Sequence, residues 1–150
     1  MREILFRGKR TGDEKWICGH LLEQNIPDCH SYIVMSIIAE LDNRHIEIMD
    51  FDINEVIPET VGQFTGLTDK NGVKIFEGDI CRFKRFNDVH VGKIVFNVTT
   101  ASFVMWYQSI VGAYGEKATH KMLLSVSDDI EVIGSIHDNP EILKVGDNNE

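Results

Sequence analysis

Two cysteines and two histidines near the start of the chain have the side chains best suited to a metal site: Cys18, His20, Cys29 and His30. Zinc in proteins is held by thiolate and imidazole groups at about 2.0–2.3 Å. The spacing C-x-H followed by an adjacent C-H pair matches no common zinc knuckle. Cys18 and His20 would share one face of a strand, and Cys29 lies in the loop after it. The pattern favours a half-buried strand face and a loop thiol over a zinc centre, so we expect neither a metal nor a cofactor.

A second pair of chemically active side chains, Glu77 and Asp79, flanks Gly78. A general acid and a general base need different surroundings that move their pKa values apart. We expect both carboxylates in an exposed turn before a strand, where they serve the turn. The sequence contains no nucleophile elbow, phosphate-binding loop, dinucleotide fingerprint or zinc-protease motif. We therefore expect that the protein is not an enzyme.

The only local excess of positive charge comes from four residues, Arg82, Lys84, Arg85 and Lys93. Strand alternation predicts that Arg82 and Lys84 face outwards while Cys81 and Phe83 face the core. Small barrels bind nucleic acid through a basic face with stacking aromatic residues, which makes this patch a candidate nucleic-acid site. The alternative is an ordinary solvated strand face whose phenylalanines are in the core. The net charge of −9 opposes the nucleic-acid hypothesis.

Composition limits the class of protein. A chain of 150 residues with 43% hydrophobic residues can bury a core and suits one domain with subregions. We find no apolar run of about 18 residues that could span a membrane, and no secretory signal. Three widely spaced cysteines do not make a disulfide framework, so we expect a reducing cytoplasm.

Residues that favour turns are most concentrated in residues 57–83. Asn71-Gly72 is the strongest turn signal, and we expect positive φ at both residues. Pro58 marks a strand end, because proline cannot donate to a sheet ladder. Three apolar residues at a spacing of three suit a single helical turn or an irregular loop: Val61, Phe64 and Leu67.

Alternating apolar residues predict a β-hairpin from residues 2–9 and 15–22. Residues 23–30 are expected to be a loop. Periodicity does not separate strand from helix over residues 31–41. We favour a second hairpin, from 31–38 and 45–51, because Asp42-Asn43 is a turn signal.

The second half of the chain predicts about five short strands. Residues 102–107 are apolar on both faces, which indicates a central strand with Phe103 and Trp106 buried. Asn139 and Pro140 predict an N-cap and the first residue of a helix. The expected strands are 79–86, 89–97, 102–107, 120–126 and 130–136, and the expected mobile loop is 108–118.

These elements predict a mainly β fold, with an SH3-like barrel in the C-terminal half and an extended β region before it. The expected division is a subdomain of residues 1–58, a barrel subdomain of residues 59–145 and a flexible tail of residues 146–150.

Three segments resemble the YopX protein family of bacterial phages and prophages: FRGKRTGDEKWICGHL, VIPETVGQFTGLTDKNGVKIFEGDICRF and DIEVIGSIHDNPEIL. They follow the family's order over nearly the whole chain. The resemblance implies a mainly β fold with an SH3-like C-terminal barrel, in a phage-encoded protein made inside a bacterial cell. It implies no activity. The chain departs from the family pattern in residues 23–55, where an insert is long and apolar.

Two hypotheses for function remain. One is a non-catalytic interaction module that binds a host or phage protein and self-associates. The other is a nucleic-acid-binding module that uses the basic patch, while no membrane partner is expected. Self-association is expected because several apolar residues lack an obvious cover: Ile33, Val34, Ile37, Ile38, Met49 and Phe51. The alternative is that residues 31–51 complete the core of a monomer.

Overall fold

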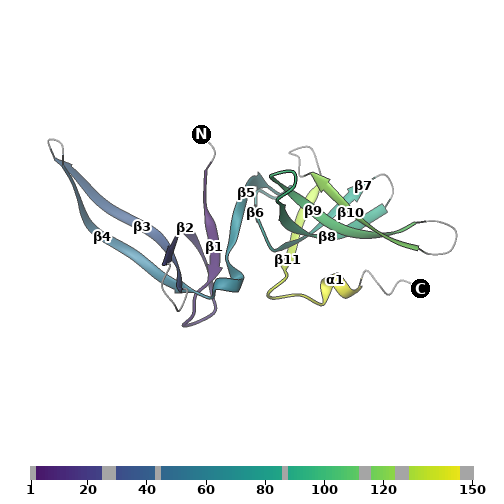
Figure 1. The fold of residues 1–150 in the computed structure, drawn as a ribbon, viewed down its shortest axis with the longest axis horizontal. Helices are drawn as coiled ribbons and strands as arrows, with labels where there is room; N and C mark the ends of the chain where they lie inside the picture. Colours follow the sequence, from purple (N-terminus) through teal and green to yellow (C-terminus); the bar gives the residue numbers. More distant parts are fainter. Residues whose placement is uncertain are drawn as a thin grey trace. The chain divides into compact units, whose positions relative to one another are not determined.

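A computed structural model describes residues 3–24, 30–42, 45–85, 88–111, 116–123 and 129–145. Over these residues the chain forms eleven β-strands, a short 3-10 helix and one short α-helix (Figure 1). All strand pairs are antiparallel, which confirms the expectation of a mainly β fold. The chain divides into two compact units, Met1–Gln63 and Phe64–Glu150.

The first unit is an antiparallel sheet with strand order β4-β3-β2-β1-β5. Its elements are β1 (Phe6–Lys9), β2 (Trp16–Gln24), β3 (His30–Asp42), β4 (His45–Val56), the 3-10 helix η1 (Pro58–Thr60) and the start of β5 (Gly62–Thr68). The pairing of β1 with β2 and of β3 with β4 confirms both predicted hairpins. Residues 31–41 are therefore strand. Their β-branched residues suit a pleated sheet better than a helix.

The core of the first unit lies on one face of this sheet. Ile33 and Val56 are 0% and 1% exposed. A Cβ added at Gly8 would lie 3.0 Å from the Cβ of Val56, so β1 can approach β4 because position 8 has no side chain. The Thr60 hydroxyl accepts a hydrogen bond from Lys9 N at 2.8 Å and donates to Ile57 O at 2.6 Å, which ties η1 to β1.

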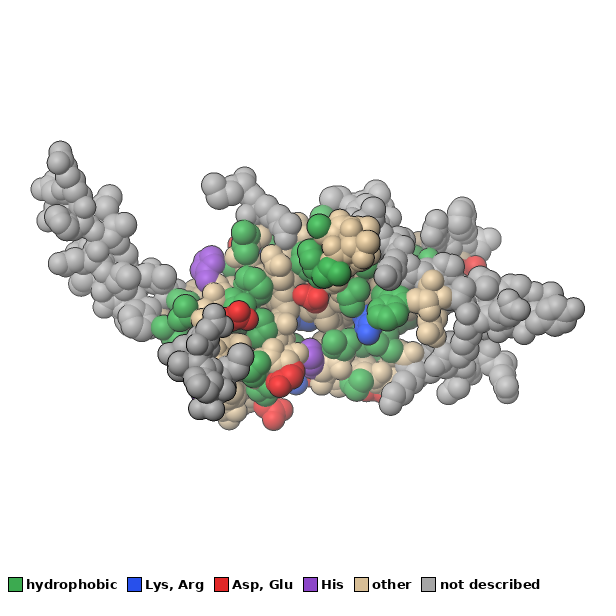
Figure 2. All heavy atoms as spheres, viewed as in Figure 1, with side chains coloured by type: hydrophobic (Ala, Val, Ile, Leu, Met, Phe, Trp, Pro, Cys, Tyr) green, Lys and Arg blue, Asp and Glu red, His purple; other side chains and the backbone are tan. Residues whose placement is uncertain are grey.

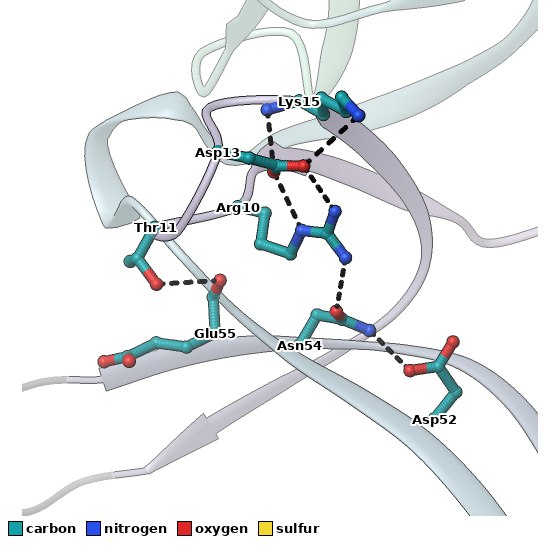
Figure 3. A network of polar contacts seen from close by, with 7 residues as sticks. All are labelled: Arg10, Thr11, Asp13, Lys15, Asp52, Asn54 and Glu55. Carbon is teal, nitrogen blue, oxygen red and sulfur yellow. Dashed lines mark hydrogen bonds and ion pairs between the residues drawn. The ribbon is translucent and has the colours of Figure 1, made fainter.

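The turn after β1 covers the end of the free edge of β4. Thr11 N donates to Glu55 O at 3.1 Å, and Ile57 N donates to Lys9 O at 2.8 Å. Figure 3 shows the side chains that support this contact: Arg10 donates to Asn54 at 3.3 Å and also pairs with Asp13. The hydrogen bond from Arg10 holds the pKa of the Asp13 carboxyl well below its usual range. The network therefore fixes the turn to the strand.

The second unit contains the rest of β5, which pairs with β6 (Lys74–Phe76), and a five-stranded sheet of order β10-β9-β8-β7-β11. Its strands are β7 (Asp79–Arg85), β8 (Asp88–Asn97), β9 (Ser102–Val111), β10 (Glu116–Leu123) and β11 (Ile130–Ser135), followed by α1 (Ile142–Val145). No ladder joins the edge strands β10 and β11 among the described residues. The sheet is therefore not closed into a barrel there.

The core of the second unit lies on the inner face of the five-stranded sheet. Phe83 and Tyr107 pack edge to face with their ring centroids 5.0 Å apart. Phe103 is buried, as predicted. The buried cluster consists of Ile75, Cys81, Phe83, Ile94, Phe103, Met105, Tyr107 and Ile130.

The turn between β5 and β6 is built on a buried carboxylate. Asp69 is 6% exposed and accepts hydrogen bonds from the backbone N–H groups of Asn71 at 2.8 Å and Val73 at 2.9 Å. Gly72 N donates to Asp69 O at 3.0 Å, and Gly72 has a φ of 83°. Asn71 does not have a positive φ, so that part of the prediction is wrong. The bonds fit a three-residue hairpin loop that needs one left-handed residue, at the glycine.

Three other predicted elements are wrong in detail. Residues 62–68 form strand β5 instead of a helical turn or loop, because they pair with β1 and then β6. Residues 108–111 and 116–118 belong to the paired strands β9 and β10 instead of the expected loop at 108–118, and residues 112–115 lie outside the described residues. The helix begins at Ile142, two residues after Pro140. The tail from residue 146 and residues 124–126 of the predicted strand lie outside the described residues.

Candidate binding surfaces

The face of the five-stranded sheet opposite the core carries most of the predicted basic residues. We call it the outer face and define it by Arg82, Lys84, Val89, Lys93 and Trp106. The register pairs Lys84 with Val89, and Lys93 with Trp106. Arg82 and Lys84 are exposed, and the intervening Phe83 is buried, which confirms the predicted alternation. The Arg85 side chain lies outside the described residues.

Glu131 on β11 partly neutralises the basic patch. Its carboxylate accepts a hydrogen bond from Arg82 Nη2 at 2.8 Å and pairs with Lys70 Nζ at 2.8 Å. The hydrogen bonds from Arg82 and Lys70 lower the pKa of Glu131 to about 2, so this carboxylate is ionised at neutral pH. Lys70 also lies 3.9 Å from Asp129. Sequence spacing did not indicate this acid, because β11 is far from β7 in sequence.

Trp106 is 40% exposed on the outer face, so the prediction of a buried tryptophan is wrong. The Lys93 ammonium lies 4.7 Å from the centroid of its ring, within cation–π distance. Val104, two residues earlier on the same face, is 2% exposed. On the outer face, the Val104 side chain is therefore shielded from solvent, whereas the Trp106 side chain is accessible to it. An apolar pattern in the sequence of a strand does not reveal which of its residues are shielded from solvent by other segments.

A shallow hollow of about 200 Å³ lies at the β7–β11 side of this face. Its lining consists of Lys70, Arg82, Phe83, Lys84, Val89, Asp129 and Glu131. Val89 is strongly exposed, and charges of both signs surround it. An exposed apolar side chain with ion pairs around it suits contact with the surface of another macromolecule.

The carboxylates on either side of Gly78 serve the backbone. Asp79 is 1% exposed and accepts a hydrogen bond from Phe76 N at 2.7 Å. Glu77 accepts one from Phe96 N at 3.1 Å. The expectation that both lie in an exposed turn is wrong for Asp79. The reason is that the neighbouring strands enclose the turn, where Gly78 N donates to Ile94 O and Gly78 O accepts from Ile136 N.

The candidate metal ligands are only partly described. Cys18 and His20 are exposed on β2, and Cys29 lies outside the described residues. His30 Nδ1 lies 2.5 Å from Glu55 Oε1, so this imidazole contacts a carboxylate on the neighbouring strand. The part of the chain that the structure describes contains no group of three or more residues arranged to hold a metal ion.

The first unit has an apolar surface of its own, on the face of its sheet opposite Ile33 and Val56. We call it the open face and define it by Leu22, Tyr32, Val34 and Ile53. The register pairs Leu22 with Tyr32, and Val34 with Ile53, so the four residues share this face. Leu22 is 49% exposed and Ile53 is 39% exposed. Apolar side chains are visible at the surface in Figure 2.

The open face corrects one part of the sequence-based argument for self-association. Ile33 is buried in the core of the first unit and is not available to a partner. Val34, its neighbour, lies on the open face and is partly exposed. The side chains of Ile37, Ile38, Met49 and Phe51 lie outside the described residues. Leu22 and Ile53 were missed as members of one surface because that depends on which strands pair and in what register.

Comparisons with known proteins place the chain in a family. The YopX protein family matches residues 5–144, and the chain belongs to it. No curated protein matches the chain. The crystal structure of protein EF1440 from Enterococcus faecalis is similar, with 22% sequence identity and a TM-score of 0.48 over 95% of this chain and 99% of that one. These matches assign no activity. Among the described residues, no helix has the length and apolar character needed to cross a membrane.

Proposed function

We propose that this protein is a non-catalytic interaction module that binds a host or phage protein through the outer face and also self-associates. The observation that carries the proposal is the exposure of Trp106 on a sheet face that also presents Val89. Tryptophan is enriched at protein interfaces, where one large rigid ring buries much apolar area at a small cost in conformational entropy. Trp106 would be the central anchor of this contact.

The charges around Trp106 favour a protein over a nucleic acid as partner. Arg82 already shares Glu131 with Lys70, so phosphate would have to compete with a bound carboxylate. The net charge of −9 adds repulsion for a polyanion. In protein complexes, by contrast, ion pairs around an apolar contact fix the orientation of the two partners.

Self-association is the second part of the proposal, and the open face of the first unit supports it. Exposed apolar residues that are contiguous on one face are uncommon on monomers and mark interfaces. Leu22 and Ile53 belong to such a group, since the register joins them through Tyr32 and Val34.

We also propose an SH3-like scaffold for the second unit. The 69–72 turn lies along the free edge of β11, where Lys70 N donates to Ile130 O at 2.9 Å and Val132 N donates to Asp69 at 3.1 Å. These bonds, one of them to the Asp69 side chain, connect the edge of β11 to the turn between β5 and β6. Contact between the last strand and the first hairpin of the unit supports the SH3-like arrangement of five strands.

Nucleic-acid binding through Arg82, Lys84, Arg85 and Lys93 is the alternative function. The contact between Lys93 and the Trp106 ring favours it. Proteins bind single-stranded nucleic acid with basic side chains that lie beside exposed aromatic rings. Steep loss of affinity with rising salt would distinguish this alternative, since phosphate contacts release counterions.

The test is an affinity pull-down from a bacterial lysate with the full chain as bait, run with and without nuclease. We expect a protein partner that is retained after nuclease treatment, lost with Trp106→Ala and kept with Val98→Ala. Val98 is the matched control because it is the most exposed large hydrophobic residue on a neighbouring turn. If the Trp106→Ala variant captures the same protein as the wild type, the outer-face proposal is refuted. If capture is lost after nuclease treatment, the nucleic-acid alternative is favoured.

A further inference from the structure

The hollow beside Val89 on the outer face is small. Its volume is about 200 Å³, below the range of roughly 300–1,000 Å³ that small-molecule sites usually have. Its lining comes from β7, β8 and β11 and from the turn after β5, which contributes Lys70. A hollow of this size on a sheet face can receive one side chain of a partner protein.

The cations of the outer face differ in whether a carboxylate binds them. Lys70 and Arg82 both contact the Glu131 carboxylate, each at 2.8 Å. Lys84 is exposed, and over the described ranges of the chain no carboxylate pairs with it. The same holds for Lys93, whose ammonium lies over an aromatic ring instead. Lys84 and Lys93 can therefore take a carboxylate from a partner.

Arg82 can bind a second carboxylate while it keeps the first. Its guanidinium carries five N–H donors, and the hydrogen bond to Glu131 comes from Nη2 alone. The Arg82 side chain is 49% exposed, so a partner can reach it. Lys84 follows two residues later on β7 and shares the outer face. Arg82 and Lys84 together therefore form one point for binding an anion at the hollow.

Lys93 is a second such point, farther along β8. The register places Val89 beside Lys84, and Trp106 beside Lys93. Because a strand rises about 3.3 Å per residue, Lys93 lies roughly 13 Å from Val89 along β8. Val91 lies between them on the same face and is partly exposed. The outer face therefore has two cationic points with apolar side chains between them.

Resting on the outer-face contact proposed above, we propose that the partner binds through an extended acidic segment that lies along β8. Every second side chain of an extended segment faces the same way, so three side chains of about five residues span the two points. The first is a carboxylate in the hollow, bound by Arg82 and Lys84. The second is apolar and packs on Val91. The third is a carboxylate at Lys93, beside Trp106.

Charge favours such a segment over a nucleic acid. Single-stranded nucleic acid follows a continuous positively charged groove, whereas Asp129 and Glu131 place negative charge in the lining of this hollow. The net charge of −9 repels every negative charge that a partner brings. A segment with two carboxylates meets less of this repulsion than a strand that has a phosphate at every nucleotide. Two separate carboxylates also match two separate cationic points.

The test selects displayed random peptides on the immobilised full chain and measures the affinity of the enriched peptides by fluorescence anisotropy. We expect peptides in which acidic, apolar and acidic residues occupy alternate positions. Lys84→Glu and Lys93→Glu should each weaken the binding of these peptides at least about tenfold. Lys15→Glu is the charge-matched control, because this side chain is 75% exposed and belongs to the first unit. It should leave the affinity unchanged.

A charge exchange sharpens the test. A peptide with lysine in place of one acid should recover binding to one of the two reversed variants. A selection that enriches no acidic peptides, or equal affinity of the acidic peptides for the wild type and both reversed variants, would overturn the proposal. Lys84→Gln and Lys93→Gln cover the case in which a reversed variant fails to fold, with an expected loss of about threefold each and an unchanged far-UV spectrum.

Two further measurements separate this proposal from its neighbours. An oligo-dT strand is the nucleic-acid probe: if it binds more tightly than every enriched peptide and loses affinity in the same variants, the acidic segment is overturned in favour of nucleic acid. In the lysate pull-down, capture that depends on Trp106 but not on Lys84 or Lys93 would overturn the acidic segment and leave the outer-face contact standing. Capture that is unaffected by all three substitutions would overturn both.

Discussion

Two turns of this protein cover the edge of a strand, and an aspartate holds each of them. The turn of residues 10–15 lies on the edge of β4, and the turn of residues 69–72 lies on the edge of β11. Asp13 binds the exposed guanidinium of Arg10, whereas Asp69 is buried and binds three backbone N–H groups. The same covering role is therefore achieved with two very different surroundings.

We expect the burial of such a carboxylate, more than its pKa, to determine how much it stabilises the fold. Burial raises the pKa of Asp69, but the hydrogen bonds from Val73, Val132 and Asn71 outweigh it and hold the pKa below its usual value. The pKa of Asp13 is also held below its usual range, because Arg10 donates to it. Water can replace Arg10 as the partner of Asp13, but nothing replaces the Asp69 carboxylate at a site closed to solvent.

Replacing Asp69 with alanine should produce the largest loss of stability. Three backbone N–H groups would lose their acceptor, and the free energy of unfolding should fall by roughly 3–5 kcal/mol. Urea denaturation followed by circular dichroism measures this change. Asp129→Ala, which removes an exposed carboxylate, is the control. A loss below about 1 kcal/mol for Asp69→Ala would show that the two turns are alike after all.

Replacing Gly72 with valine should have an intermediate effect. The residue has a φ of 83°, and a Cβ there would meet no atom within 4 Å, so the cost is one of backbone strain alone. We expect a loss of about 1–3 kcal/mol. Gly72→Asn should cost less, because asparagine tolerates the left-handed region. Equal melting temperatures for the valine and asparagine variants would contradict this explanation.

Acid should reduce the contribution of Asp69 in a defined direction. A carboxyl whose pKa is lower in the folded state stabilises above its unfolded pKa, and that contribution is lost as the pH falls through the folded pKa. The stability difference between wild type and Asp69→Asn should therefore be constant near neutrality and shrink below about pH 4. Urea titrations at a series of pH values test this. A difference that grows in acid would reverse the assigned sign.

Replacing Asp13 with alanine should have the smallest effect. The carboxylate and its partner Arg10 are solvent-exposed, so their attraction is screened and the turn keeps its backbone bonds to β4. We expect no measurable change in the denaturation midpoint in moderate salt. A clear loss would mean that the network in Figure 3 does more than fix the turn locally.

Local patterns predicted the strands well, because alternation and turn residues act over a few neighbouring positions. Both N-terminal hairpins, the burial of Phe103 and the outward direction of Arg82 and Lys84 follow from such patterns. The family was also identifiable from its segments, and its match is confirmed.

The errors at Trp106 and Asp79, and the missed role of Glu131, share one physical origin, which is contact between distant segments. Trp106 is exposed and Asp79 is buried because of the segments that do or do not pack over each residue. The alternation of apolar and polar residues in a strand carries no information on that packing. The pairing of Glu131 with Arg82 also depends on which strands are neighbours. The open face depends on the register between β2, β3 and β4, because a shift of one residue would turn the side chains of a whole strand to the other face.

The chain's two tryptophans, Trp16 and Trp106, belong to different units. Each has a cation near its ring: Arg7 Cζ lies 4.4 Å from the centroid of Trp16, and Lys93 Nζ lies 4.7 Å from that of Trp106. Loss of either contact on unfolding changes the surroundings of one indole and leaves the other untouched. Variants that keep a single tryptophan would therefore give each unit its own fluorescence reporter. Whether the two emission curves coincide during denaturation would establish whether the chain unfolds in one cooperative transition or in two.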